Sequence, residues 1–355
     1  MDKATPLNVT TSPKPSPPPP PATMFQRIAS SVGFKKRYNF VLWFIFTGAL
    51  LGFTLARLPY FSFYGFFCSA KPVSSNLHAA PGECWYLQQG FEQVGIILHL
   101  VTILPVGILV CLQFTPVIRH RLIILHRING YLVLLLSVLS MAGVFMIIRH
   151  SFGGGLDTQM VNGVIAITFL GSLGMAYYNI KKLQIEQHRM WMLRAWFYAG
   201  SIITLRLIFF ISATVISTQY GYYAARPCGQ IENALGNNKT TWVVVYATMK
   251  GNAAEIMAAI GATFGAAGWL ALAMHAIGVE IYLKLTPAEH ERLRNVSYQR
   301  QVEAGMANPG RAGLTVDRFG DSEKWPGRRI VTLALEHIRS LRYREKGTRY
   351  TEEAR

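Results

Sequence analysis

The chain is poor in charged residues, has few cysteines, and carries no motif for binding nucleotides. Only 15% of its 355 residues are charged, whereas 51% are hydrophobic, and the hydrophobic residues fall in long runs. Soluble globular domains carry about 25% charged residues, so this composition excludes an ordinary soluble protein. The Gly-rich stretch at residues 152–155 lies in a turn between two apolar runs, which excludes a phosphate-binding loop there.

Six apolar runs are long enough to cross a bilayer, because a hydrocarbon core of about 30 Å needs roughly 20 apolar residues in a helix. An all-α membrane bundle is therefore predicted. The first run lies close to the start of the chain and is long enough to span, which predicts a signal anchor and no cleavable signal peptide. A shorter apolar run at 242–248 predicts an interfacial segment. The six predicted spans are residues 39–58, 94–114, 128–148, 159–180, 191–217 and 252–282.

Acidic residues are scarce as well, with 18 Asp and Glu against 35 Lys and Arg. The basic residues gather before the first span and after the second, fourth and sixth, and cytoplasmic loops carry the positive excess. Both termini are therefore predicted to be cytoplasmic. The predicted organisation is a disordered Pro-rich N-terminus at 1–37, a membrane domain at 38–283 with its repeated core at 94–217, and a basic tail at 284–355. No nucleic-acid module is visible, so the charge indicates topology and contact with anionic lipid of the bilayer.

The basic tail contains one clear helix start. Thr286, Pro287 and Glu289 have the pattern of a capping hydroxyl, a first-turn proline and an acid three residues after the cap. A helix from there to about residue 298 is predicted, and the apolar spacing at 330–343 predicts a second, amphipathic helix.

Only four cysteines are present, and three lie in segments predicted to face outward, where disulfides persist. Cys68 and Cys84 are the natural pair because they close a short loop, although Cys228 leaves other connectivities open. Asn238 begins an Asn-Lys-Thr glycosylation triplet in the outer loop that also holds Cys228. A membrane of the secretory route is predicted: endoplasmic reticulum, vacuole or plasma membrane.

Two spans open on a basic stretch that ends in His-Arg. RHRLIILHR ends at Arg127 and KKLQIEQHR ends at Arg189, and in each the histidine, His126 or His188, follows the first basic residue by seven positions. Each stretch closes one span and opens the next, which predicts two copies of a helical hairpin with a histidine at the cytoplasmic turn. If a pseudo-twofold axis relates the hairpins, the two imidazoles lie at equal depth, an arrangement that can hold a haem iron from both sides.

We therefore predict a haem b cofactor with His126 and His188 as iron ligands and Arg127 and Arg189 as partners of the haem propionates. His275, on the sixth span, is a substitute ligand. The alternative interpretation of the two His-Arg pairs is anchoring to lipid phosphate and packing.

His99 lies about 22 Å along its helix from residue 114, so it cannot share an iron with a histidine at that end of the bundle. It remains a separate candidate for cofactor binding, for which Met160 is the nearest repeat-related partner. The alternative is a hydrogen bond to a neighbouring helix. Arg206 on the fifth span is deep enough to require a partner, and a propionate, Glu255 or lipid phosphate are the candidates. Arg194 lies on the same span.

Three aromatic residues near the inner face could flank a flat ligand, although an interfacial aromatic belt also accounts for them. They are Tyr131, Trp191 and Trp196.

The motifs LHLVTILPVGILVCLQFTP in the second span, HRINGYL at the third and HRMWMLRAW at the fifth occur in this order within residues 94–210. The pattern resembles an uncharacterised family of predicted multi-spanning membrane proteins of bacteria and filamentous fungi, which implies no particular activity. More distantly, the paired histidines are similar to those of transmembrane cytochromes b that pass electrons from ascorbate to ferric iron or oxidised ascorbate. Those proteins use two histidine pairs on four consecutive helices. The fourth span here has no histidine, which argues against a two-haem relay.

Three functions are left open by the sequence. A haem-dependent membrane oxidoreductase, supplied with electrons by a quinol, ascorbate or a reductase, ranks first. A non-catalytic membrane anchor or assembly factor ranks second. A transporter ranks third, because few charges enter the spans.

Overall fold

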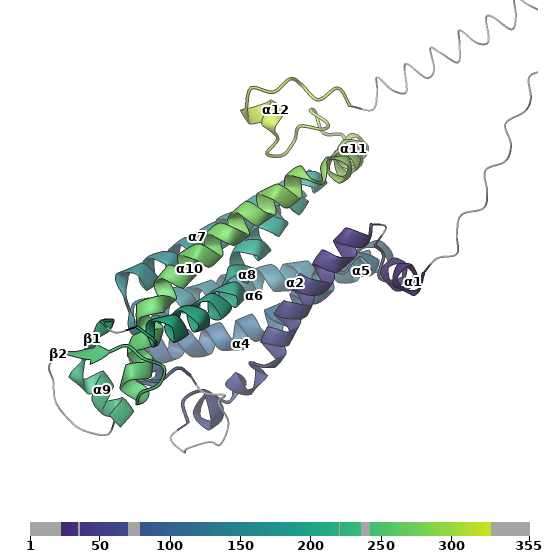
Figure 1. Ribbon diagram of the computed structural model, residues 1–355. Coiled ribbons are helices and arrows are strands. Elements are labelled where there is room, and N and C mark those ends of the chain that lie inside the picture. Colours follow the sequence, from purple (N-terminus) through teal and green to yellow (C-terminus); the bar gives the residue numbers. More distant parts are fainter. Residues whose placement is uncertain (1–22, 35, 70–78, 220, 236–241, 328–355) are drawn as a thin grey trace, which may run out of the picture.

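The computed structural model describes residues 23–34, 36–69, 79–219, 221–235 and 242–327, and these parts form a helical bundle (Figure 1). Within these described ranges, six helices are long and apolar enough to cross a membrane, which confirms the predicted multi-pass membrane fold. The third and fifth of them begin five and six residues earlier than predicted. The six are α2 (Arg37–Leu55), α4 (Gly90–Gln113), α6 (Ile123–Ile147), α7 (Leu156–Lys181), α8 (Ile185–Ile216) and α10 (Ala253–Lys284).

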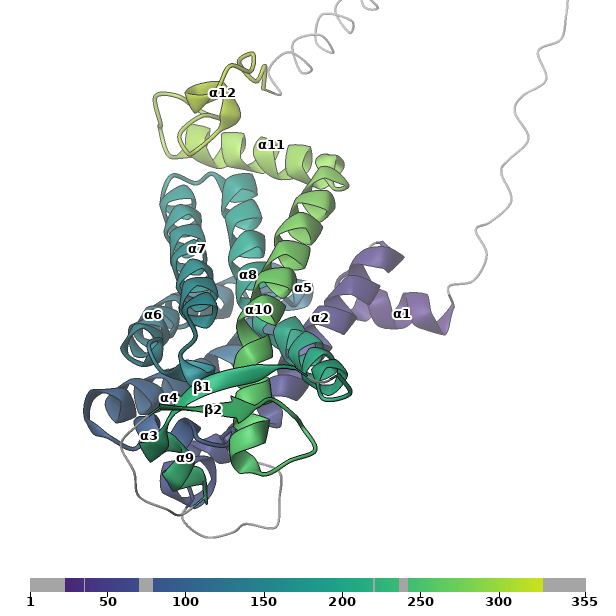
Figure 2. The ribbon, with the colours of Figure 1, turned by 60° about the vertical axis from the view of Figure 1, so that its left-hand side comes forward.

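Shorter elements decorate the two ends of the bundle (Figures 1 and 2). What we call the tail end carries α1 (Met24–Ser31), α5 (Pro116–Arg121), α11 (Pro287–Glu303) and α12 (Val316–Phe319). What we call the disulfide end carries η1 (Leu58–Phe61), η2 (Phe63–Phe67), α3 (Glu83–Leu87), η3 (Ser151–Gly153), β1 (Tyr223–Pro227), α9 (Cys228–Leu235) and β2 (Trp242–Tyr246). The proline-rich segment, Asn238 and the predicted helix at 330–343 lie outside the described residues.

The spans pack as two hairpins, α4 with α6 and α7 with α8, and α10 packs along α8 and α7. Small residues set how closely they approach. A methyl group added at Gly143 of α6 would lie 2.5 Å from the carbonyl oxygen of Gly95 on α4. One added at Gly268 of α10 would lie 2.9 Å from the Val161 side chain on α7. Helix packing in a membrane depends on such close contact, because lipid supplies no hydrophobic drive between helices.

The first span, α2, contacts the rest of the bundle at few places. Phe40 and Thr54 are its only buried residues. Thr54 packs against Gly107 of α4, and near the tail end the Tyr282 hydroxyl of α10 donates to Asn39 Oδ1 at 3.2 Å. Between these two contacts α2 forms the side wall of a cavity.

The interfacial location of the apolar run at 242–248 stays a prediction, but the sequence did not indicate the strand that forms there. Its residues form β2, which pairs antiparallel with β1, so that Tyr223 faces Tyr246 and Ala225 faces Val244. β-branched residues favour the pleated conformation, and the hairpin satisfies backbone groups that an isolated interfacial strand would leave unpaired.

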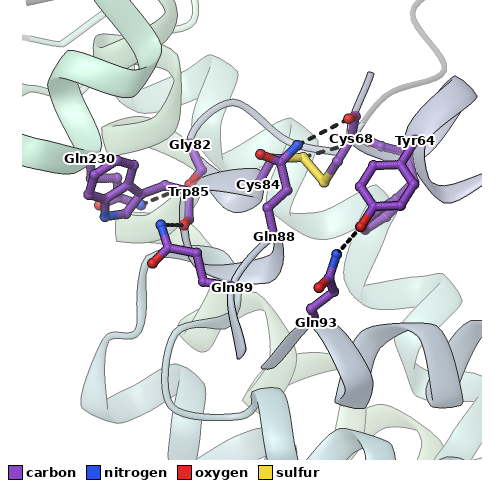
Figure 3. The surroundings of a disulfide bond; sticks show 10 residues. Tyr64, Cys68, Gly82, Cys84, Trp85, Gln88, Gln89, Gln93 and Gln230 are labelled. Atoms are coloured by element: carbon purple, nitrogen blue, oxygen red, sulfur yellow. Dashed lines mark hydrogen bonds between the residues drawn. A yellow bond between two sulfur atoms is a disulfide. The ribbon is translucent and has the colours of Figure 1, made fainter. Parts of the chain in front are cut away.

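The Cys68–Cys84 disulfide joins η2 to α3, and glutamine side chains fix the loop around it (Figure 3). Gln88 Nε2 donates to the Cys68 carbonyl at 3.1 Å, and Gln230 of α9 donates to the Gly82 carbonyl at 3.3 Å. The disulfide and these bonds therefore hold α3 at the disulfide end of the bundle, with its first residue, Glu83, buried.

At the tail end, α11 lies across the ends of α7 and α8 (Figure 2). It begins at Pro287 and extends to Glu303, five residues beyond the predicted end. Thr286 is the N-cap residue and Pro287 opens the helix, as predicted, but the predicted capping bond is absent: the Thr286 hydroxyl donates instead to the Tyr282 carbonyl at 3.1 Å. The chain can therefore turn from α10 into α11 without a gap.

Buried polar groups attach this tail to the α7–α8 turn. Gln184 Oε1 accepts from Gln301 Nε2 and from the Gly313 N–H, both at 2.9 Å, and Gln184 Nε2 donates to Glu186 at 2.5 Å. The Ser297 hydroxyl donates to the other carboxylate oxygen of Glu186 at 2.5 Å. We call Gln184, Glu186, Ser297 and Gln301, all buried, the tail clamp.

Candidate functional site

A cavity of about 2500 Å³ runs inside the bundle along most of its length, between α2 and the walls formed by α4, α6, α8 and α10. Its walls are mainly apolar, whereas charged residues line both ends. Arg57, Glu83 and Arg206 lie at the disulfide end, and Arg119 and Glu289 lie at the tail end. Pockets for small ligands are commonly about 300–1,000 Å³, so this cavity has room for a large ligand or for more than one.

The two histidines of the repeated stretch occupy equivalent places. His126 is the fourth residue of α6 and His188 is the fourth residue of α8. The backbone N–H of each bonds to the residue four positions earlier, His126 to Leu122 at 2.9 Å and His188 to Gln184 at 3.0 Å. Both side chains line the same cavity. The two turns themselves differ, because α5 lies between α4 and α6, whereas α7 is followed directly by α8, so the equivalence of the hairpins stays a prediction.

The His188 ring has a defined orientation. Its Nδ1 lies 2.9 Å from the carbonyl oxygen of Ala176 on α7. A carbonyl can only accept, so Nδ1 carries the proton and Nε2 keeps a lone pair. Second-shell bonds of this kind orient histidines that bind metals.

The His126 ring is held more loosely. Its Nε2 is 3.4 Å from Gln113 Nε2, a long contact, and its buried Nδ1 has no hydrogen-bond partner in the described part of the chain. Asn129 donates to Gln113 Oε1 at 2.8 Å and so fixes which end of that amide faces the ring. An unmet buried ring nitrogen is costly unless something else satisfies it.

The other two candidate histidines are engaged with neighbouring helices. His275 accepts from or donates to Thr204 Oγ1 at 2.7 Å, and its Nδ1 lies 2.8 Å from the Phe197 carbonyl, so both ring nitrogens are occupied. His99 Nδ1 lies 2.9 Å from Ser140 Oγ. The structure therefore favours packing for His275, and it accounts for His99 by the bond to α6 that the sequence left as its alternative.

Basic residues surround the tail end of the cavity. Arg189 donates to the Tyr282 and Thr286 hydroxyls at 3.4 Å, while Arg127 lines the cavity and is otherwise exposed. Arg119 also lines it, although the sequence gave no reason to separate this arginine from its basic neighbours. The hydrogen bonds of Arg292 hold the pKa of Glu289 below its usual range. Glu289 therefore stays ionised, but the arginines that line this end outnumber it.

The remaining predicted residues have other partners. Glu255 completes a capping box with Asn252 at the start of α10, so it does not pair with Arg206. Arg194 forms an ion pair with Glu280 at 2.6 Å. Of the three aromatics, Tyr131 and Trp196 line the cavity, and Trp196 Nε1 is buried without a partner in the described residues.

Among the residues that the structure describes, no group of three or more His, Cys, Asp or Glu side chains could hold a metal ion. A porphyrin brings four nitrogen ligands of its own, so an iron in haem needs only one or two protein ligands. Two imidazoles that line one cavity, one oriented by a carbonyl and the other with an unmet ring nitrogen, fit that requirement.

Comparison with known proteins supports the membrane assignment. Residues 96–225, which contain both hairpins, match the family described as predicted membrane protein (DUF2306). The chain is 24% identical to Ava biosynthesis cluster protein G of Aspergillus versicolor over 332 residues, covering 75% of this chain and 94% of that protein. No solved structure matches. The chain is therefore similar, across its central helices, to a family of predicted membrane proteins, and more distantly to a fungal biosynthesis-cluster protein.

Proposed function

We propose that this integral membrane protein binds haem b between His126 and His188 and acts in electron transfer. The observation that carries the proposal is the pair of repeat-equivalent imidazoles that line one cavity. The bond from His188 Nδ1 to the Ala176 carbonyl leaves the opposite ring nitrogen available as a ligand. The unmet Nδ1 of His126 indicates that this ring lacks its full set of partners.

The charged groups at the tail end suit the acidic edge of a porphyrin. Arg119, Arg127 and Arg189 line the cavity there, and a guanidinium pairs well with a carboxylate. When bound, the haem would supply one-electron chemistry, and the protein residues would ligate it, neutralise its propionates and keep water away.

The proposal includes an orientation. The basic residues of α5, Arg119, His120 and Arg121, lie at the same end of the bundle as α1 and α11, so the tail end is proposed to face the cytoplasm. The electron donor would then be cytoplasmic or a membrane quinol. A disulfide at the opposite end fits a membrane of the secretory route. The name of the fungal relative connects that protein to a biosynthesis cluster, and a redox step in biosynthesis is the extension that we propose for this chain.

The test is a reduced-minus-oxidised visible spectrum of the purified protein in detergent, with a pyridine extract to count haem. The parent should show a sharp b-type band that is lost in His126→Ala and in His188→Ala. His275→Gln is the matched control, since His275 lines the same cavity but has both ring nitrogens engaged. It should keep the band.

A featureless spectrum from folded, monodisperse parent protein would refute haem binding. The anchor or assembly function would then lead, favoured by the docked tail that the clamp holds. A transporter would be favoured instead if the cavity proved to conduct a solute between its two charged ends.

A further inference from the structure

Arg206 has an unusual environment for an arginine in a membrane span. It lies ten residues before the end of α8 at Ile216, about 15 Å along the helix, beside Phe152 of the η3 turn. Its side chain lines the cavity, and no hydrogen bond or ion pair joins its guanidinium to any residue that the structure describes. A charged group within a membrane span is costly unless a partner satisfies it.

Aromatic rings supply part of that environment. The guanidinium carbon lies 4.3 Å from the ring centre of Phe152 and 5.3 Å from that of Phe264, and the two rings stack on each other with centres 4.0 Å apart. Cation–π contacts stabilise the charge, but a ring does not replace an oxygen acceptor. The five N–H donors of the guanidinium still need acceptors.

The nearby ionisable groups do not supply them. Arg57 and Glu83 are the charged groups whose fields act on Arg206. The Glu83 carboxylate is already engaged by the backbone N–H groups of Phe152 and Gly153, and Arg226, which donates to the Gly153 carbonyl at 2.7 Å, adds a further positive charge. Two arginines, Arg206 and Arg226, thus share one carboxylate, and Arg57 adds a further positive charge beside Arg206.

We propose that the disulfide end of the cavity binds the anionic headgroup of an amphipathic molecule, with Arg206 and Arg57 as its ligands and the apolar walls holding its chain. Oxygen acceptors of a carboxylate or phosphate would satisfy the guanidinium donors, and charge-assisted bonds of this kind are strong. The cavity continues from these arginines between apolar side chains of α2, α4 and α8, which suits a hydrocarbon body. The ligand class is a long-chain acid, either free or as an anionic lipid.

This site is separate from the proposed haem site. His188 and Arg206 are 18 residues apart on α8, about 27 Å along the helix. Binding of an acid is therefore measured on protein with or without haem, and failure of one proposal leaves the other standing.

The experiment is displacement of cis-parinarate, a carboxylate that fluoresces in apolar sites, from the full-length protein in a neutral detergent. Oleate should displace it and oleyl alcohol should not, because the two differ only in the headgroup. Arg206→Gln should weaken oleate binding by about tenfold or more, the effect of losing one charge-assisted bond. Arg194→Gln is the matched control, since it removes an arginine of the same helix that is paired with Glu280. It should bind oleate as the parent does.

Equal displacement by the alcohol, or unchanged oleate affinity in Arg206→Gln, would overturn the proposal. If Arg206→Gln does not fold, Arg57→Gln at the end of α2 provides the same test and should also weaken oleate binding. A parallel titration with phosphatidylglycerol identifies the source of the headgroup. Tighter binding of phosphatidylglycerol than of oleate would assign the site to bilayer lipid, and the reverse would assign it to a free acid.

Discussion

Replacing Gln184 with alanine should release the tail from the membrane bundle. Gln184 is fully buried, and its side chain makes four hydrogen bonds, to Glu186, Gln301, the Gly313 N–H and the Gly310 carbonyl. The last three of these bonds cross to the tail, so at about 1 kcal/mol for each bond the docking equilibrium loses about 3 kcal/mol, or more than a hundredfold. The backbone groups of Gly310 and Gly313 would also lose their partner.

Hydrogen exchange with mass spectrometry measures this directly. In the parent protein the amides of Gly310, Gly313 and Leu314 are bonded to Gln301, Gln184 and Asn179, so they should exchange slowly. In Gln184→Ala they should exchange much faster, while the membrane helices keep their protection. Gln299→Ala is the control, because Gln299 is an exposed glutamine on α11. Equal exchange of these amides in Gln184→Ala and the parent would refute the tail clamp as the cause of docking.

Three further predictions follow from the packing and charges of the bundle. Gly143→Ala should lower the melting temperature markedly, because the added methyl group meets the backbone of α4. Gly171→Ala should not, because a methyl group at that position has no atom within 4 Å. Equal melting temperatures for the two variants would contradict the close crossing of α4 and α6. Burial raises the pKa of Glu83 to about 7, so the native protein binds this proton more tightly than the unfolded protein does. The stability that this adds is complete below about pH 4.5 and is lost as the pH rises through 7. The melting temperature should therefore be lower at pH 8 than at pH 5, and Glu83→Gln should reduce that difference. Cys84→Ser should lower the free energy of unfolding by about 3 kcal/mol, because it opens a loop of sequence separation 16. It should also speed hydrogen exchange at residues 83–87 of α3. Unchanged exchange there would show that the glutamine contacts hold α3 without the disulfide.

The sequence predicted what depends on long, local patterns. Apolar runs identified six spans, and His126 and His188 both lie at the fourth position of a span helix, in line with their equal spacing. The structure also joins Cys68 to Cys84, the pair that loop length favoured. These features repeat or extend over many residues, so local physics is enough to predict them.

Features that depend on distant pairing escaped prediction. β2 looked like an interfacial segment because its partner strand lies beyond an intervening helix, and no local pattern indicates that pairing. Glu83 appears in the sequence as an ordinary acid beside a cysteine, yet the fold buries it at the end of the cavity. In the sequence, Gln184 and Glu186 are two polar residues within a basic stretch. They are buried because the tail folds back onto them, and no local pattern indicates that contact.

The tail clamp also sets different evolutionary constraints on the two repeated turns. Residues 179–185 form hydrogen bonds with residues 297–314 of the same chain, so a change in one segment affects the other. The corresponding first turn has exposed residues such as Leu122 and Ile124. Exchanging the two turns in a chimaera would therefore preserve the histidine spacing and yet destroy a buried polar interface.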